Sequence, residues 1–216
     1  LRKLLRDNKN KLNTGFVGTP LLCNVLTEHG MTDLAYRLLL NEEYPGWLHE
    51  VKLGATTVWE RWNSLDENGR ISSTGMNSLN HYAYGSITEW LWGSVAGIRP
   101  CEEAPGFRKA QIVPHVNWKL KSVAARFPSP AGVYRILWEI RDLSHICLRV
   151  EVPKGCEAEV VLPLHPERKR VFLTGESQEF FYETERRLDL INGLKAKYGQ
   201  RIEEIQEYQK KQLLIW

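Results

Sequence analysis

The periodicity of apolar residues changes once along the chain, at Pro105-Gly106, and this change constrains the fold more than any other sequence feature. Before it, apolar residues recur every three or four positions, as on the buried face of a helix. After it, short runs rich in valine, isoleucine and aromatic residues are separated by turn residues, which is typical of strands. Separate runs of helix and strand predict an α+β chain of two modules and argue against an alternating α/β fold.

The first module, residues 1–105, is expected to be helical. Thr19 followed by Pro20 is a start signal, with Thr19 as the N-cap, and Thr32 is expected to cap the next helix. The chain also opens on an uncapped helical pattern, so it resembles a piece of a longer protein. The expected helices cover residues 19–29, 32–43 and about 80–96, whereas residues 47–64 are expected to be non-helical.

The second module, residues 106–183, is expected to be an antiparallel β-sandwich, because its strand patterns recur about every ten residues. A third segment, residues 184–216, is charged and predicts a C-terminal helical tail. The expected strands are residues 111–117, 120–127, 132–140, 145–152, 157–163, 170–173 and 178–182.

Charge and composition exclude several classes of function. Lysine and arginine number 29 against 26 acidic residues, and a net charge of +3 is too small to indicate nucleic acid or an anionic membrane as partner. No apolar run approaches the roughly 18 residues that a membrane span needs. The six histidines are scattered without metal-ligand spacing, and no phosphate-binding glycine motif occurs, so we expect no metal and no cofactor. The four cysteines show no regular spacing and are expected to be free thiols in a reducing, cytoplasmic compartment.

The stretch Trp59-Glu60-Arg61-Trp62 is the first candidate for chemistry. Apolar tryptophan walls raise the pKa of a carboxyl group and a neighbouring guanidinium lowers it, which is how a general base is tuned. The alternative interpretation is a structural Glu60–Arg61 pair beneath an aromatic lid.

A second candidate is the segment 77–86, in which His81 and Tyr82 could reach sugar hydroxyls. A histidine at a helix start is also a common cap or core residue. Tryptophan faces stack on sugar rings, although core packing is the alternative, and Trp90 and Trp92 cannot both lie on one helix face. The tryptophans concerned are Trp47, Trp59, Trp62, Trp90 and Trp92.

Four stretches taken together resemble the bacterial α-L-rhamnosidases of glycoside hydrolase family 78. They are residues 14–20, 44–47, 54–62 and 77–85, and the likeness runs from Leu1 to about Glu183. The resemblance implies the last part of an (α/α)6 barrel followed by a C-terminal β-sandwich, and an inverting mechanism. It also implies that Glu60 is the general base, that His81 contacts rhamnose, and that Trp47 and Trp59 line the sugar site.

The resemblance departs from the family in one respect: the upstream stretch that carries the general acid is absent. We therefore expect a C-terminal fragment that acts on terminal α-L-rhamnosides only with the missing upstream part, and that is inactive alone. The remaining acidic candidates are expected to be solvated surface carboxylates: Asp33, Glu42, Glu43, Glu50 and Asp66. The alternatives are a non-catalytic carbohydrate-binding or accessory module, and a degenerate remnant with neither role.

Overall fold

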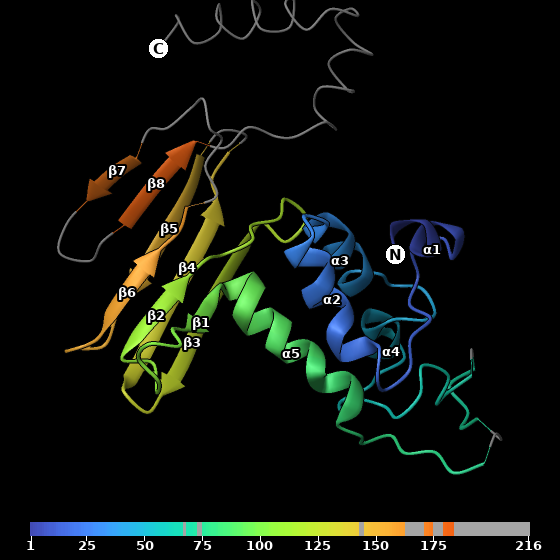
Figure 1. Cartoon of the computed structure of the whole chain (residues 1–216). Coiled ribbons are helices and arrows are strands. Elements are labelled where there is room, and N and C mark those ends of the chain that lie inside the picture. Colours follow the sequence, from blue (N-terminus) through green and yellow to red (C-terminus); the bar gives the residue numbers. More distant parts are fainter. Residues whose placement is uncertain (67, 73–74, 143–144, 163–170, 175–178, 184–216) are drawn as a thin grey trace, which may run out of the picture.

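The helical elements precede the strands in the computed structural model, which describes residues 1–66, 68–72, 75–142, 145–162, 171–174 and 179–183. The predicted helical tail, residues 184–216, lies outside the described residues. The helices are α1 (Arg2–Asp7), α2 (Thr19–Glu28), α3 (Thr32–Leu39), α4 (Trp47–Lys52), the 3₁₀ helix η1 (Ala83–Ser86), α5 (Ile87–Trp90) and the π-helix η2 (Leu91–Ala96). Figure 1 shows η1, α5 and η2 as one helical rod.

Helices α2 and α3 form where the sequence predicts them, although their caps differ from the prediction. The N-cap of α2 is Gly18, and Thr19 is already in the first turn, where its buried hydroxyl donates to the Gly15 carbonyl at 2.8 Å. The N-cap of α3 is Met31 in place of Thr32. A threonine in the first turn can back-bond to a preceding carbonyl, so its side chain is used inside the helix and not as its cap.

The expectation that residues 47–64 are non-helical is wrong for α4. This helix has only six residues, and the backbone leaves it through Gly54 at φ +87°. A helix of under two turns carries too few positions for a periodic pattern to be recognised. The third predicted helix begins at residue 83, three residues later than expected.

The strands make two sheets. One has the order β1 (Ile98–Pro100), β2 (Lys109–Ile112), β6 (Glu157–Val160). The other has the order β3 (Ser122–Ser129), β4 (Gly132–Ile140), β5 (His145–Glu151), β8 (Glu179–Glu183), β7 (Val171–Thr174). The larger sheet is antiparallel throughout, as predicted, but β2 pairs with β6 in parallel. Strand β1, before residue 105, has no counterpart in the prediction.

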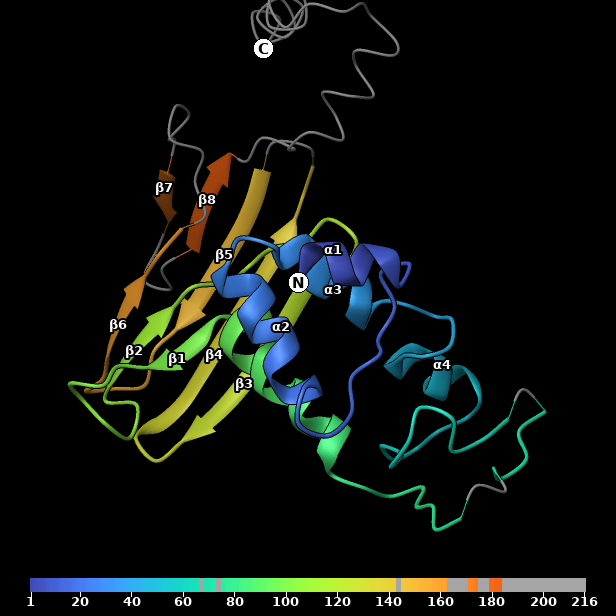
Figure 2. The same cartoon turned by 45° about the vertical axis from the view of Figure 1, so that its right-hand side comes forward.

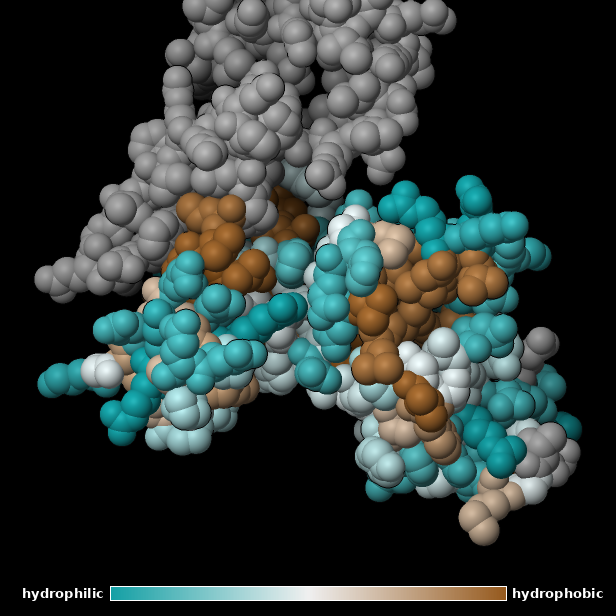
Figure 3. All heavy atoms as spheres, viewed as in Figure 1, coloured by the Kyte–Doolittle hydropathy of each residue, from teal (hydrophilic) through white to brown (hydrophobic). Residues whose placement is uncertain are grey.

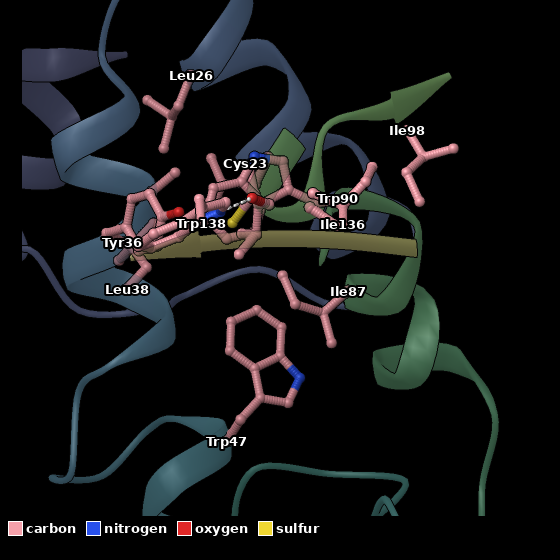
Figure 4. Packing of buried hydrophobic residues seen from close by; sticks show 14 of the residues in the cluster. Cys23, Leu26, Tyr36, Leu38, Trp47, Ile87, Trp90, Ile98, Ile136 and Trp138 are labelled. Atoms are coloured by element: carbon pink, nitrogen blue, oxygen red, sulfur yellow. Dashed lines mark hydrogen bonds between the residues drawn. The ribbon is translucent and has the colours of Figure 1, made fainter. Parts of the chain in front are cut away.

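The rod that ends in η2 lies between α2 and the sheets, as both views show (Figures 1 and 2). The helical half and the sheets share one apolar core, which Figure 4 shows around Trp90 and Trp138. The Trp138 indole N–H donates to the Val95 carbonyl at 2.8 Å, and the Tyr36 hydroxyl donates to the His115 carbonyl at 2.6 Å. The first contact is buried and joins β4 to η2, and the second is part-buried and joins α3 to the segment that follows β2. Both contacts fix the helical half against the rest of the chain.

Trp90 and Trp92 confirm that two tryptophans two positions apart face different ways. Trp90 is 1% exposed in the core, whereas the half-buried Trp92 packs edge-on against Phe127 of β3, with ring centroids 5.3 Å apart. No described helix is long and apolar enough to cross a bilayer. The four cysteines, all among the described residues, form no disulfide bond, and burial raises the pKa of the Cys23 thiol to about 12.

Candidate active site

The two candidate motifs, residues 54–62 and 77–86, lie side by side and are joined by backbone hydrogen bonds. The Glu60 N–H donates to the Ser78 carbonyl at 2.9 Å, and the His81 N–H donates to the Val58 carbonyl at 2.8 Å. Further along, two hydrogen bonds join Asn77 to Ser64. The Ser64 hydroxyl donates to the Asn77 side-chain carbonyl at 2.7 Å, and the Asn77 side-chain NH₂ donates to the Ser64 main-chain carbonyl at 2.9 Å. The tertiary structure thus brings the glutamate and the histidine onto adjoining segments.

Glu60 is half-buried, and one of its carboxylate oxygens has a fixed donor. The Ser78 backbone N–H donates to Oε2 at 2.8 Å. Within the described part of the chain, Glu60 makes no ion pair and Oε1 accepts no hydrogen bond. A carboxylate that is oriented through one oxygen and free at the other can take a proton from a water molecule.

His81 is held by its own turn and by aromatic neighbours. Its Nδ1 accepts the Ala83 backbone N–H at 3.2 Å, so in the neutral ring the proton resides on Nε2, which remains a donor. The half-buried imidazole stacks on Phe16, with centroids 4.9 Å apart and planes 13° apart, and on Tyr82 at 5.0 Å. The arrangement offers a hydrogen-bond donor beside exposed aromatic surface, since Phe16 is 45% and Tyr82 87% exposed.

Trp47 and Trp59 lie in the interior, with 8% and 2% of their surface exposed. The Trp47 indole N–H donates to the Tyr84 carbonyl at 3.0 Å, and its ring meets Trp62 edge-on. Trp62 in turn stacks on Tyr84 with centroids 3.9 Å apart. These buried indoles pack on the interior side of the two motif segments. A contact of Trp47 or Trp59 with sugar stays a prediction.

Phe16 lies beside the candidate site through its contact with His81, and the sequence alone gave it no role. It comes from the segment 14–20, some 65 positions before His81. The sequence offered one indication of a role for Phe16, namely its place in a motif shared with the resembled family. Its stacking on His81 joins segments that are distant in sequence, so no local pattern could predict it.

Glu50 corrects the expectation that the remaining carboxylates are solvated. It is 3% exposed on α4, and burial raises its pKa to about 7, although the Trp59 backbone N–H partly offsets this. The same expectation is confirmed for the other four carboxylates, which are exposed: Asp33, Glu42, Glu43 and Asp66. The missed signal was the spacing of Trp47 and Glu50, three apart on one face of a helix that the sequence did not predict.

Among the described residues, no cluster of histidine, cysteine or carboxylate side chains could hold a metal ion. One hollow of about 290 Å³ is lined by residues of β3, β4 and β5, and another of about 390 Å³ is lined by Pro130 and residues of the segment 100–107. Glu60 lines neither of them. The candidate chemistry is therefore that of a positioned carboxylate, an imidazole donor and aromatic surface.

The helical half packed on two sheets, with Glu60 in a tryptophan-rich loop, can be compared with known families of the same architecture. Residues 1–95 match the bacterial α-L-rhamnosidase six-hairpin glycosidase domain, and residues 97–175 match the bacterial α-L-rhamnosidase C-terminal domain. The chain belongs to the bacterial α-L-rhamnosidase family.

Individual relatives agree with this assignment. An α-L-rhamnosidase of Alteromonas sp. (strain LOR) is 44% identical over 165 residues, and one of Formosa agariphila is 42% identical over 163 residues. Each alignment covers 76% of this chain but only 18% and 17% of those proteins. The chain therefore spans less than a fifth of the length of these relatives.

Solved structures give the same result. The crystal structure of a Streptomyces avermitilis α-L-rhamnosidase complexed with L-rhamnose superposes with a TM-score of 0.73 and 36% identity, over 85% of this chain and 18% of that one. The crystal structure of an Aspergillus terreus α-L-rhamnosidase superposes with a TM-score of 0.72 and 34% sequence identity, and the match covers 86% of this chain and 21% of that one.

Proposed function

We propose that this chain is the C-terminal part of an inverting α-L-rhamnosidase and supplies its general base, Glu60. The observation that carries the proposal is the Glu60 carboxylate, which Ser78 orients through Oε2 while Oε1 accepts no bond from a described residue. An inverting glycosidase uses such a group to activate a water molecule on the face of the sugar opposite the leaving oxygen.

His81 and its aromatic neighbours would bind the sugar in this scheme. The Nε2–H of a neutral His81 can donate to a rhamnose hydroxyl, and the exposed face of Phe16 or Tyr82 can stack on apolar C–H groups of the ring. The presence of L-rhamnose in the similar Streptomyces avermitilis structure supports this choice of ligand.

The general acid would come from a segment outside this chain. The two carboxyl groups of an inverting site stand about 6.5–9.5 Å apart, each touching substrate or water. The acidic candidates here do not fit, because Glu50 is buried and the other four are exposed carboxylates outside the paired motifs.

Exposed apolar surface on the helical half supports an upstream partner. Figure 3 shows a continuous apolar area over the helices. Exposed apolar residues of this half include Leu4, Val17, Leu21 and Val51, at 59–84% exposure. A surface of this kind fits packing against further helices of a six-hairpin barrel better than contact with water.

The test compares this chain with the enzyme that contains it. We expect the purified chain to release no phenol from an aryl α-L-rhamnoside, and the complete enzyme to do so unless Glu60 is replaced by glutamine. Turnover by the chain alone, abolished by Glu60→Gln, would place the acid within these residues. Rhamnose binding by the chain with full activity of the Glu60→Gln enzyme would favour the non-catalytic binding module.

A further inference from the structure

The outer face of the larger sheet carries a hollow that the proposed mechanism does not use. Side chains alternate between the two faces of a strand, and Tyr134, Ile136 and Trp138 of β4 are buried in the core. Arg135 and Leu137, which alternate with them, therefore lie on the opposite face, where Arg135 is exposed and Leu137 half-buried. The hollow on this face measures about 290 Å³ and extends over β3, β4 and β5.

The register of the three strands arranges six of the residues that line this hollow in two adjacent rows. The first row crosses β3, β4 and β5 as Arg126, Arg135 and Glu151, and the second as Ala124, Leu137 and Arg149. These six residues define the arginine hollow, in which three guanidinium groups adjoin two apolar side chains and one carboxylate.

The arginine hollow brings like charges together across β3 and β4. Arg126 is the direct cross-strand partner of Arg135, and like charges in such a pair destabilise a sheet. Arg135 Nη1 donates to Glu151 Oε2 at 2.9 Å, whereas Arg126 makes no ion pair with a described residue. Arg149 faces Glu179 of β8 in the register, so the excess positive charge belongs to Arg126 and Arg135. An anion bound between these two would remove the repulsion.

The two opposed arginines suit a carboxylate group. Directly opposed residues of an antiparallel pair have Cβ atoms about 5 Å apart, so both guanidinium groups can reach one ligand. A guanidinium is a planar fork of N–H donors that binds a carboxylate through two parallel hydrogen bonds. Arg135 retains donors besides the one that Glu151 accepts.

The rest of the hollow fits a short saccharide that carries the carboxylate. Ala124 and Leu137 supply apolar surface for the C–H groups of a sugar ring, and the volume lies near the lower end of the range for small-ligand sites, about 300–1,000 Å³. A nucleic acid would need cations along an extended stripe. Here the carboxylates of Glu139 and Glu151, exposed on the same face, confine the positive charge to one place.

We propose that the arginine hollow is a non-catalytic binding site for the carboxylate of a uronic acid, so that the enzyme holds acidic saccharides at a place separate from Glu60. The binding of a carboxylate follows from Arg126 and Arg135, whereas the choice of a saccharide as its source rests on the proposed function. Because both arginines are exposed, added salt should weaken the binding.

Titration calorimetry of the 216-residue chain with trigalacturonic acid tests the site without turnover. We expect wild type to bind, and Arg126→Ala to raise the Kd about fivefold, as the loss of an exposed ion pair with good geometry does. Arg126→Lys should recover only part of the affinity, because lysine has no planar fork. The matched control, Arg37→Ala, removes an exposed arginine of α3 and should leave the Kd unchanged. An equal Kd in wild type and Arg126→Ala would overturn the proposal.

A second variant covers the case in which Arg126→Ala does not fold. Arg126→Gln keeps most of the side-chain length without the charge and should raise the Kd to the same extent. Amides of β4 and β5 report whether the sheet is intact. A folded Arg126→Gln chain that binds trigalacturonic acid like wild type would also overturn the proposal.

Three further ligands distinguish the sources of the anion. The methyl ester of trigalacturonic acid lacks the charge and should not bind. Inorganic sulfate that binds as tightly as the trisaccharide would reduce the hollow to a site for an adventitious ion only, and hexaglutamate that binds more tightly would favour an acidic protein partner. Either result would overturn the assignment to a saccharide. So would binding by the chain but not by the complete enzyme, because the upstream part would then cover the hollow.

Binding and turnover are measured separately, so this proposal and the proposed function can fail independently. If Arg126→Ala loses the trisaccharide but the Glu60→Gln enzyme retains full activity on an aryl α-L-rhamnoside, the carboxylate site stands and the general-base role of Glu60 falls. If Glu60→Gln is inactive and Arg126→Ala binds the trisaccharide like wild type, the arginine hollow falls alone.

Discussion

The backbone N–H of Ser78 donates to Oε2 of Glu60 at 2.8 Å, across 18 positions of sequence. Together with the bond from the Glu60 N–H to the Ser78 carbonyl, it makes the two motifs one unit. A carboxylate held in this way keeps its direction although no cation among the described residues pairs with it, so its second oxygen remains available to a water molecule.

Replacement of the proposed base should remove activity without harming the fold. In the complete enzyme, Glu60→Gln should lower kcat by about 10²–10⁴-fold, which is the usual contribution of a positioned acid–base group. Release of phenol from an aryl α-L-rhamnoside measures it. Glu89→Gln, on the surface of α5, is the control and should retain full turnover. A Glu60→Gln enzyme within a factor of three of wild type would contradict the role.

The link between Asn77 and Ser64 should contribute to stability. Asn77→Ala removes two part-buried hydrogen bonds, and the loss in free energy of unfolding should be about 1–3 kcal/mol. Denaturant unfolding measures it, with the exposed Asn63→Ala as a control expected within about 0.5 kcal/mol of wild type. Equal changes in the free energy of unfolding of the two variants would show that the hydrogen bonds between Asn77 and Ser64 do not stabilise the fold.

Burial of Glu50 predicts a specific dependence of stability on pH. Its pKa is raised to about 7 in the folded chain, against about 4.3 when unfolded, so the folded state binds more protons between these values. The stabilisation is complete below about pH 4.3 and is lost as pH rises through 7. The free energy of unfolding of wild type minus that of Glu50→Gln should therefore fall by about 2–3 kcal/mol from pH 5 to pH 8.

The comparison with Glu50→Gln removes the effect of other groups. Burial, and secondarily the charge of Arg99, lower the pKa of His115. This histidine therefore makes the folded state less stable as pH falls below about 6.5, which is the opposite pH dependence to that of Glu50. That contribution is common to both proteins and cancels. A difference that does not change with pH would show that Glu50 titrates normally.

Gly97 should tolerate no side chain. It ends η2 at φ +81°, and a Cβ there would lie 2.3 Å from the backbone nitrogen of Pro114. Gly97→Ala should lower the free energy of unfolding by more than about 3 kcal/mol, because backbone must move as well as adopt a strained φ. Gly30→Ala, at φ +68° with open space around it, should cost about 1 kcal/mol. Thermal unfolding that ranks the two variants equally would contradict this.

The sequence alone determined the features that depend on neighbours along the chain. Helices α2 and α3 and strands β4 and β5 follow from the local spacing of apolar residues, because each buries one face against a common core. Motif similarity likewise identified the family, and with it Glu60 and His81 as candidates, since those stretches are continuous in sequence.

Only the tertiary structure decided the features that depend on contacts between distant segments. The parallel pairing of β2 with β6 joins strands that lie 45 residues apart or more, which no local pattern encodes. The stacking of Phe16 on His81 and the pairing of Glu60 with Ser78 arise in the same way. Burial of Glu50 depends on α4, which is too short to be recognised by periodicity, and on the tertiary packing around that helix. The exposure and pKa of a carboxyl group are set by whatever surrounds it in space, so the sequence supplied the carboxylates and the fold assigned their environments.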